Sequence, residues 1–167
     1  DGECAEGGGV CCDFTEGGDT TIGAGGGVFQ VKGYPDPNSR AGENVATLQP
    51  PAGTVQVKLT FEDFEMMPPV DGDCTNDTFV FVGANPGTEL PVLCGFNTGQ
   101  HMYIDVDNSE GPWSLVSTKS GEDFPRRYKV KVDYLSASDP GRAPFRCLQH
   151  YPEKEGEMSS FNYNKNG

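Results

Sequence analysis

The stretch that decides the fold is TVQVKLTF, residues 54–61. Apolar side chains recur there at every second position, in Val55, Val57, Leu59 and Phe61, with polar residues between them. Successive side chains of a β-strand point to opposite faces of the sheet. The alternation therefore predicts a strand with one face in a core and the other toward solvent.

The same period of two recurs on both sides of this stretch, and turn-forming Pro, Gly, Asn and Asp residues separate the runs. Several half-buried strands at this spacing are typical of an antiparallel sandwich. We therefore predict an all-β fold, an antiparallel β-sandwich of jelly-roll type. The further apolar positions are Phe79 and Phe81; Met102, Ile104 and Val106; and Tyr128, Val130, Val132 and Tyr134.

Composition narrows the class of protein. The chain has 167 residues, of which 23 are Gly and 13 are Pro, and these 36 residues disfavour long helices. A net charge of −13 argues against nucleic acid as a partner, since phosphate would be repelled. No run approaches the roughly 18 apolar residues of a membrane span, so we expect no membrane insertion.

The cysteines indicate the compartment. An even number, six, in a Gly-rich acidic chain favours disulfides formed outside the cytosol, so we expect a secreted, extracellular protein. The sequence has only two histidines and no paired CxxC units, which argues against a metal–thiolate site. The Asn76-Asp77-Thr78 sequon predicts glycosylation of Asn76. Because the sequence starts at Asp1, we expect a mature form whose leader has been removed.

Composition also divides the chain into four segments. Residues 1–24 form a Gly- and Cys-rich arm with many acids and no base, which we expect disulfides to tie down. Residues 25–135 hold the sandwich, and 136–144 read as a linker. Residues 145–167 contain too few apolar residues for a core of their own, although they include Phe145, Tyr151, Phe161 and Tyr163.

The middle of the chain resembles a CUB domain. The resemblance is carried by LTFEDFEM (59–66), CTNDTFVFVGA (74–84) and LCG (93–95). LPVLCGFNTGQHMYIDVD and RRYKVKVDYL are more specifically similar to secreted arthropod CUB proteins, and GECAEGGGVCCDF resembles their cysteine-rich lead-in. CLQHYPEKEGEMSSFNY resembles the first strands of a second CUB repeat, so 145–167 is either that or a strand-donating tail.

The resemblance implies a disulfide between Cys74 and Cys94. A further disulfide usual in the family is missing here, together with both of its cysteines. The remaining cysteines have no assigned pairing. Adjacent cysteines rarely bond each other, so we expect one of Cys11 and Cys12 to pair with Cys4 and the other with Cys147, within one molecule or between two.

Calcium is the cofactor that the resemblance suggests. In many CUB domains two Asp and a Glu hold calcium and present it to a lysine of the ligand, and Asp77 matches one of these ligands. The Glu position falls on or beside Met67, and the third ligand has no match around 108–110. Asp105-x-Asp107-x-Ser109 adds a short calcium-loop pattern, but Val116 stands where an EF-hand requires Glu. Asp77, Asp105 and Asp107 are thus the candidate ligands, and a solvated acidic face without cofactor is the alternative.

Arg127, Lys129 and Lys131 form a basic row on one face of the predicted strand at 127–135. Two interpretations stay open: charges that keep an edge strand from pairing with other sheets, or a surface that meets acidic residues of a neighbouring molecule.

No catalytic motif is present: no nucleophile elbow, no HExxH and no phosphate loop. We therefore expect a non-catalytic interaction or structural module. Our first hypothesis is that copies of it assemble into an extracellular filament through their terminal segments. The alternative is a soluble module that binds a glycan or a protein.

Overall fold

The computed structural model describes residues 2–3, 10–11 and 19–163. This part of the chain forms strands, turns and loops, so it contains no helix that could cross a membrane. Near the N-terminus, β1 (Gly2–Glu3) pairs antiparallel with β2 (Val10–Cys11).

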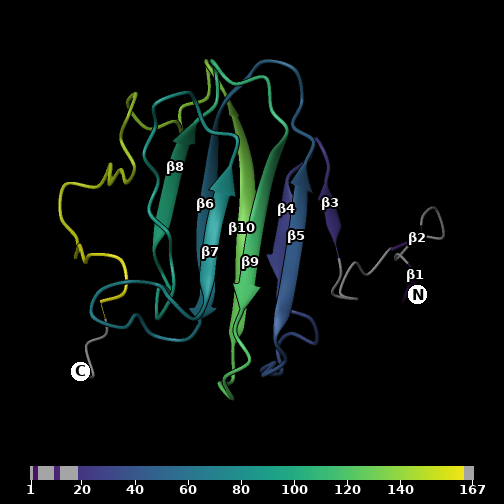
Figure 1. Ribbon diagram of the computed structural model, residues 1–167. Coiled ribbons are helices and arrows are strands. Elements are labelled where there is room, and N and C mark those ends of the chain that lie inside the picture. The colour runs from purple at the N-terminus through teal and green to yellow at the C-terminus, as the bar shows by residue number, and fades with distance from the viewer. Residues whose placement is uncertain (1, 4–9, 12–18, 164–167) are drawn as a thin grey trace.

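The remaining strands form two four-stranded sheets that face each other, as Figure 1 shows. The first sheet is antiparallel throughout, and its order is β4 (Gly27–Gln30), β10 (Arg127–Ser136), β6 (Thr54–Glu65), β8 (His101–Asp105). The second sheet has the order β3 (Thr20–Ile22), β5 (Gly42–Leu48), β9 (Trp113–Lys119), β7 (Thr78–Val82). There β3 is parallel to β5 and the other pairs are antiparallel, so the predicted all-β sandwich is confirmed.

The alternation in 54–61 places Val57, Leu59 and Phe61 in the core, each completely buried. Two positions depart from it: Val55, predicted to face the core, is only half-buried, and Gln56, predicted to face solvent, is 1% exposed. Its Oε1 accepts a hydrogen bond of 2.9 Å from the Ala143 backbone N–H, so a segment from beyond the sandwich covers it.

A bulge in β6 lets two nearby aromatic side chains face the core. The register between β6 and β10 shifts between Lys129 and Val130, which leaves Glu62 opposite no residue of β10. Phe61 and Phe64, three positions apart, would face opposite sides of a regular strand. The extra residue brings both rings inside, with centroids 5.2 Å apart in an edge-to-face arrangement.

These two rings belong to an aromatic centre that joins the sheets. Phe29 of β4 and Tyr128 of β10 meet Phe79 of β7 with centroid distances of 6.0 Å, and Phe64 lies 5.3 Å from Phe79. Tilted and edge-to-face pairs add about 0.5–1.5 kcal/mol each beyond the area they bury. The aromatic contact between the sheets therefore lies near the end of β6 and the starts of β7 and β10.

Cys74 and Cys94 form the predicted disulfide, with Cα atoms 5.7 Å apart and a sequence separation of 20. Within the described part of the chain, Cys147 is half-buried and has no disulfide partner. The side chains of Cys4, Cys11 and Cys12 lie outside the described residues, so their pairing stays a prediction.

We expect the double change Cys74→Ser and Cys94→Ser to lower the free energy of unfolding by about 3 kcal/mol, because the open loop gains entropy in the unfolded chain. Urea denaturation of both proteins measures the difference. Thr75→Ser, at an exposed position of the same loop, is the control because it leaves every cysteine in place. Equal losses in the two variants would contradict the expectation.

Candidate functional site

A buried ion pair stands at one end of the sandwich. Asp77 directly precedes β7 and Arg126 directly precedes β10, and both side chains are completely buried. Arg126 Nε donates to Asp77 Oδ2 at 2.8 Å, and Nη2 donates to Oδ1 at 2.9 Å. This two-point geometry is the strongest way in which a guanidinium can hold a carboxylate.

The remaining donors of Arg126 reach two further loops. Nη1 donates to the backbone carbonyls of Ser39, Glu122 and Phe124, at 3.2, 2.7 and 3.1 Å. Nη2 also donates to Ser120 Oγ at 2.9 Å. One guanidinium thus joins the β4–β5, β6–β7 and β9–β10 connections.

Asp77 is satisfied from both sides. Oδ2 accepts the Met67 backbone N–H at 2.9 Å, and Oδ1 accepts the Ser120 backbone N–H at 3.0 Å. Burial alone raises the pKa of Asp77, but the hydrogen bonds from Arg126 and the two backbone N–H groups outweigh it. The resulting pKa lies below the ordinary 3.8, so the carboxylate is ionised.

Lys119, the last residue of β9, is a second cation in the same region and is 6% exposed. Burial lowers its pKa and the nearby Arg126 charge lowers it further, whereas Asp77 raises it. One carboxylate therefore stands with two basic groups, an environment that disfavours a divalent cation.

The structure separates the three predicted calcium ligands. Asp77 precedes β7, whereas Asp105 and Asp107 lie beyond its other end: the Asn85 backbone N–H donates to the Asp105 carbonyl, and Asn85 Nδ2 donates to Asp107 Oδ1. The five residues of β7 span about 16 Å. Among residues 19–163, no three His, Cys, Asp or Glu side chains group so that they could hold a metal.

The basic row lies where the alternation predicts, on the outward face of β10, but its charges are paired within the chain. Arg127 Nε lies 2.6 Å from Asp63, Lys129 Nζ 2.8 Å from Glu62, and Lys131 Nζ 2.9 Å from Asp133. The hydrogen bonds to Asp63 and Glu62 raise the pKa of Arg127 and of Lys129. The edge-strand interpretation is wrong, because β10 lies between β4 and β6.

Residues 137–163, called the tail below, lie along β8, the outer strand of the first sheet, as Figure 1 shows at its left side. The Tyr103 backbone N–H donates to the Leu148 carbonyl at 2.8 Å. The His150 backbone N–H donates to His101 Nε2 at 3.2 Å, and Gln100 Nε2 donates to Ser159 Oγ at 2.7 Å. The tail holds its place by polar contacts, which a count of apolar residues does not detect.

The four aromatic residues predicted to make contacts divide into two pairs. Phe161 meets the core ring of Phe61 at 6.5 Å, and the ring of Tyr151 meets that of His101 at 4.8 Å. Phe145 and Tyr163 are instead 60% and 52% exposed. The first pair fastens the tail to its own sandwich, and the second is available to a partner.

Gly95 of the LCG motif provides room for the tail. It adopts φ +68°, and a Cβ there would overlap Asn162 Oδ1. That oxygen accepts the Phe96 backbone N–H at 3.0 Å, while Asn97 Oδ1 accepts the Asn162 backbone N–H at 2.8 Å. Glycine is therefore needed at position 95 both for the positive φ and for the space that a Cβ would take from Asn162.

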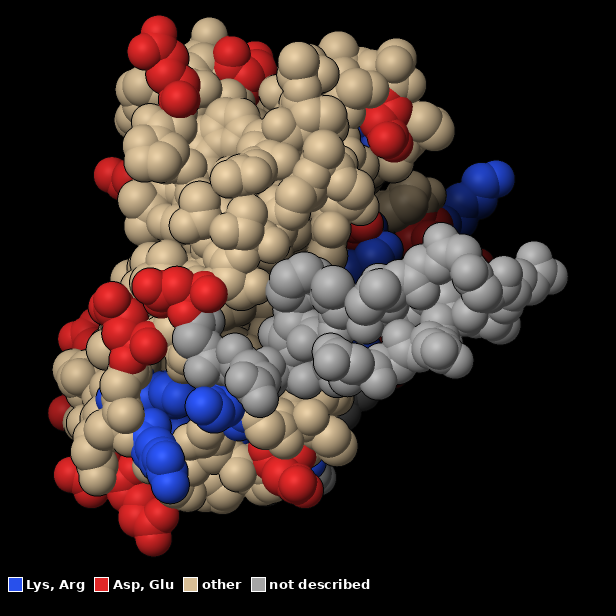
Figure 2. Space-filling model, turned by 90° about the vertical axis from the view of Figure 1, so that its right-hand side faces the viewer, with Lys and Arg blue, Asp and Glu red and all other residues tan. Residues whose placement is uncertain are grey.

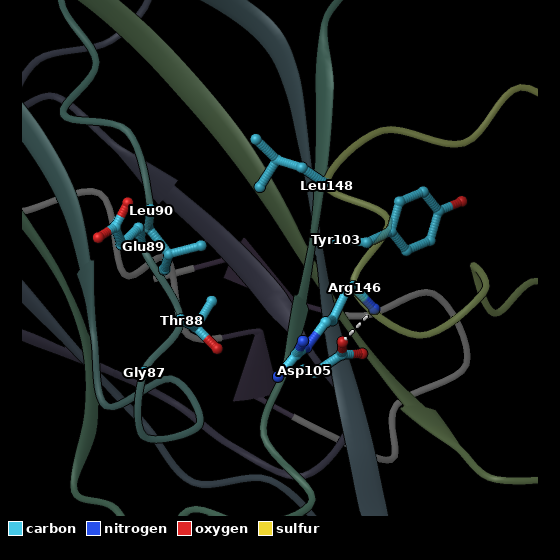
Figure 3. Close-up of a pocket in the computed structure, with 8 residues that line it drawn as sticks. All are labelled: Gly87, Thr88, Glu89, Leu90, Tyr103, Asp105, Arg146 and Leu148. Atoms are coloured by element: carbon cyan, nitrogen blue, oxygen red, sulfur yellow. Dashed lines mark hydrogen bonds between the residues drawn. The ribbon is translucent and has the colours of Figure 1, made fainter.

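A pocket of about 300 Å³ lies between the tail and the β7–β8 connection. Residues 87–90 form one wall, while Tyr103, Asp105, Arg146 and Leu148 form the other, as Figure 3 shows. The Arg146 backbone N–H donates to Asp105 Oδ2 at 2.7 Å. Among the described residues no acid forms an ion pair with the Arg146 guanidinium, so the pocket offers a cation.

Sequence reasoning did not identify Arg126 as a functional residue. The alternation already contained the signal, because Arg126 has the parity of Tyr128 and Val130, both completely buried, and not of Arg127. An arginine at an inward position needs a buried carboxylate.

Asn76, the predicted glycosylation site, is half-exposed next to buried Asp77, and its glycosylation stays a prediction.

No family model matches the sequence, and no curated protein sequence matches it. Among solved structures, the CUB2 domain of MASP-1 bound to Ca²⁺ has a TM-score of 0.54 and 16% identity, over 68% of this chain and 96% of that one. The CUB1-EGF-CUB2 domain of human MASP-1/3 has a TM-score of 0.56 and 17% identity, over 75% and 49%. The full extracellular region of zebrafish Gpr126/Adgrg6 has a TM-score of 0.55 and 21% identity, over 70% and 14%.

These likenesses establish the fold: the chain has a CUB-type β-sandwich, as the sequence resemblance implies. The chain spans about half of the MASP-1/3 fragment and a seventh of the Gpr126 region. The residues present around Asp77 do not fit calcium, because the carboxylate is committed to Arg126 and Lys119 adds positive charge.

We expect Arg126→Met to lower the free energy of unfolding by about 3–5 kcal/mol, since it leaves Asp77 charged and buried without its partner. Arg127→Met, which removes a partly exposed pair at the next position, is the control and should cost far less. Chemical denaturation compares the variants. Similar losses at both positions would show that burial of the pair contributes nothing special.

We expect excess calcium to leave the melting temperature unchanged relative to chelator-treated protein, because Asp77, Asp105 and Asp107 do not come together. Differential scanning calorimetry measures the melting temperature, and isothermal titration measures any heat of binding. A rise in melting temperature with calcium would contradict our assignment of Arg126 as the counter-ion.

Proposed function

We propose that this chain is an extracellular, non-catalytic binding module whose partners include other copies of itself, assembled into a filament. The CUB-type fold and the Cys74–Cys94 disulfide support an extracellular setting. Both histidine rings contact groups across the boundary between tail and sandwich: His101 Nε2 meets the backbone of His150, and the His150 ring lies 6.4 Å from the Tyr103 ring. Their role is structural in this interpretation.

The observation that carries the proposal is the outward side of the tail. Phe145, Met158 and Tyr163 are 60%, 75% and 52% exposed, on a segment that hydrogen bonds hold against β8. Contact with a neighbouring molecule would remove the apolar area of these side chains from water, which favours association. The tail contacts its own sandwich on one side and would contact a neighbour on the other.

The alternative is a soluble module that binds a glycan or a protein in the pocket of Figure 3. The observation that favours it is the guanidinium of Arg146, which lines the pocket opposite the wall that contains Thr88 and Glu89. These groups suit a ligand that carries both an acceptor and a donor of hydrogen bonds. Calcium has no part in either version, for the reasons given above.

We expect the molar mass of the full chain in solution to rise with concentration, and the variant Phe145→Ser, Met158→Ser, Tyr163→Ser to need a higher concentration for the same rise. The reason is the loss of apolar area at the contact. Size-exclusion chromatography with light scattering gives the masses.

Val70→Ser, at a loop valine 49% exposed, is the matched control and should behave as the unmodified chain. If the unmodified chain keeps the mass of one copy at every concentration, self-association is wrong. The pocket alternative then remains, and loss of glycan or peptide binding in Arg146→Ala would locate it.

A further inference from the structure

Four charge-free stretches of the sequence come together in the second sheet. In a chain that is 22% charged, residues 20–31, 44–57, 78–88 and 111–118 contain no Asp, Glu, Lys or Arg. These stretches hold all of β3 and β7 and nearly all of β5 and β9. The same stretches also include β4 and the first residues of β6, but in the second sheet they supply nearly every position of all four strands.

The strand register arranges the outward side chains of this sheet in rows. Val45, Val116 and Val80 lie opposite one another on β5, β9 and β7. Their sequence neighbours Ala46 and Leu115 face the core and are completely buried. The outward positions, which we call the neutral face, are Thr21, Val45, Thr47, Thr78, Val80, Val82, Ser114, Val116 and Thr118.

The neutral face is β-branched except for Ser114, and Glu43 at the end of β5 is the one charge at an outward position of these four strands. Val82 is 47% exposed, and Val92, next to the bridge between Leu93 and Phe79, is 49% exposed. Figure 2 views the adjoining side of the molecule, where β3 and β5 lie; a broad area in its upper half lacks charged side chains and has acidic ones at its border.

The outward face of the first sheet is the opposite case. It carries Arg127, Lys129 and Lys131 with their acidic partners. A sheet face that only had to stay soluble would carry such charges. The contrast within one sandwich indicates that the neutral face meets another surface.

We propose that the neutral face packs against the neutral face of a second copy. This inference rests on the proposed self-association and names the surface where it occurs. The net charge is −13, so copies repel each other wherever acids meet, and contact between two neutral faces avoids this repulsion. Two flat sheets with Val and Thr side chains pack face to face about 10 Å apart.

The size of the face sets the strength of the contact. Four strands about 4.8 Å apart, each with about five residues at about 3.3 Å, give a few hundred Å². A stable interface buries roughly 800 Å² on each partner. The neutral face alone therefore supports weak pairing, which a second contact through the tail would strengthen.

The test uses complementary charges at the centre of the face. Val116→Glu and Val116→Lys, each in the full chain, should weaken self-association by roughly tenfold or more, since each buries an unpaired charge at the contact. An equimolar mixture of the two variants should restore it, because the opposite charges then meet. Sedimentation equilibrium measures association, and native mass spectrometry reports mixed pairs. Thr47→Glu with Thr47→Lys repeats the test at an exposed position, should Val116 variants lose their fold.

Thr60→Glu, on the outward face of the first sheet, is the control and should associate like the unmodified chain. Restoration in the mixture supports pairing of like faces. Unchanged association of the single variants, or weakening that the mixture does not reverse, overturns the inference. Absence of association in the unmodified chain is a separate outcome that overturns the proposed function itself.

Discussion

The Arg126–Asp77 pair determines how one end of this sandwich is built. A charged group enters a core only when its partners satisfy it. Eight hydrogen bonds hold Arg126 and Asp77 to each other and to the loops, so a loop that moved away would leave a buried charge with fewer partners. The three loops are therefore fixed by a cation that belongs to the chain. Removing one partner of the pair would lower the free energy of unfolding by several kcal/mol, a large fraction of the roughly 5–15 kcal/mol that stabilises a typical domain.

The strands could be predicted from sequence because their signal is local, whereas the disulfide could be predicted only through the family resemblance. Alternation in 54–61 depends only on the geometry of the strand, and it placed Val57, Leu59 and Phe61 correctly. The Cys74–Cys94 pair followed from the CUB resemblance. The bulge at Glu62 could not be predicted this way, since it depends on how β10 pairs with β6.

The site was harder to predict because it depends on contacts between distant residues. Asp77 was identified as a functional carboxylate, but its partner lies 49 positions away and no local pattern joins them. The tail was expected to need another molecule because its apolar residues are few. The tail is attached by hydrogen bonds between Gln100 and Ser159 and between Asn97 and Asn162. These residues are far apart in the sequence, so their pairing could be seen only in the fold.

Charge then explains why the two sheets differ in their outward faces. On the first sheet each base of β10 meets an acid of the same chain, so this face is neutralised internally and gains nothing from a neighbour. On the second sheet charge is missing instead, and the surface keeps apolar area that water solvates poorly. The tail, along β8, lies on a different side of the molecule from the neutral face. A copy that uses both surfaces has two distinct neighbours, and repeated contacts of two kinds extend an assembly into a filament instead of closing it as a dimer.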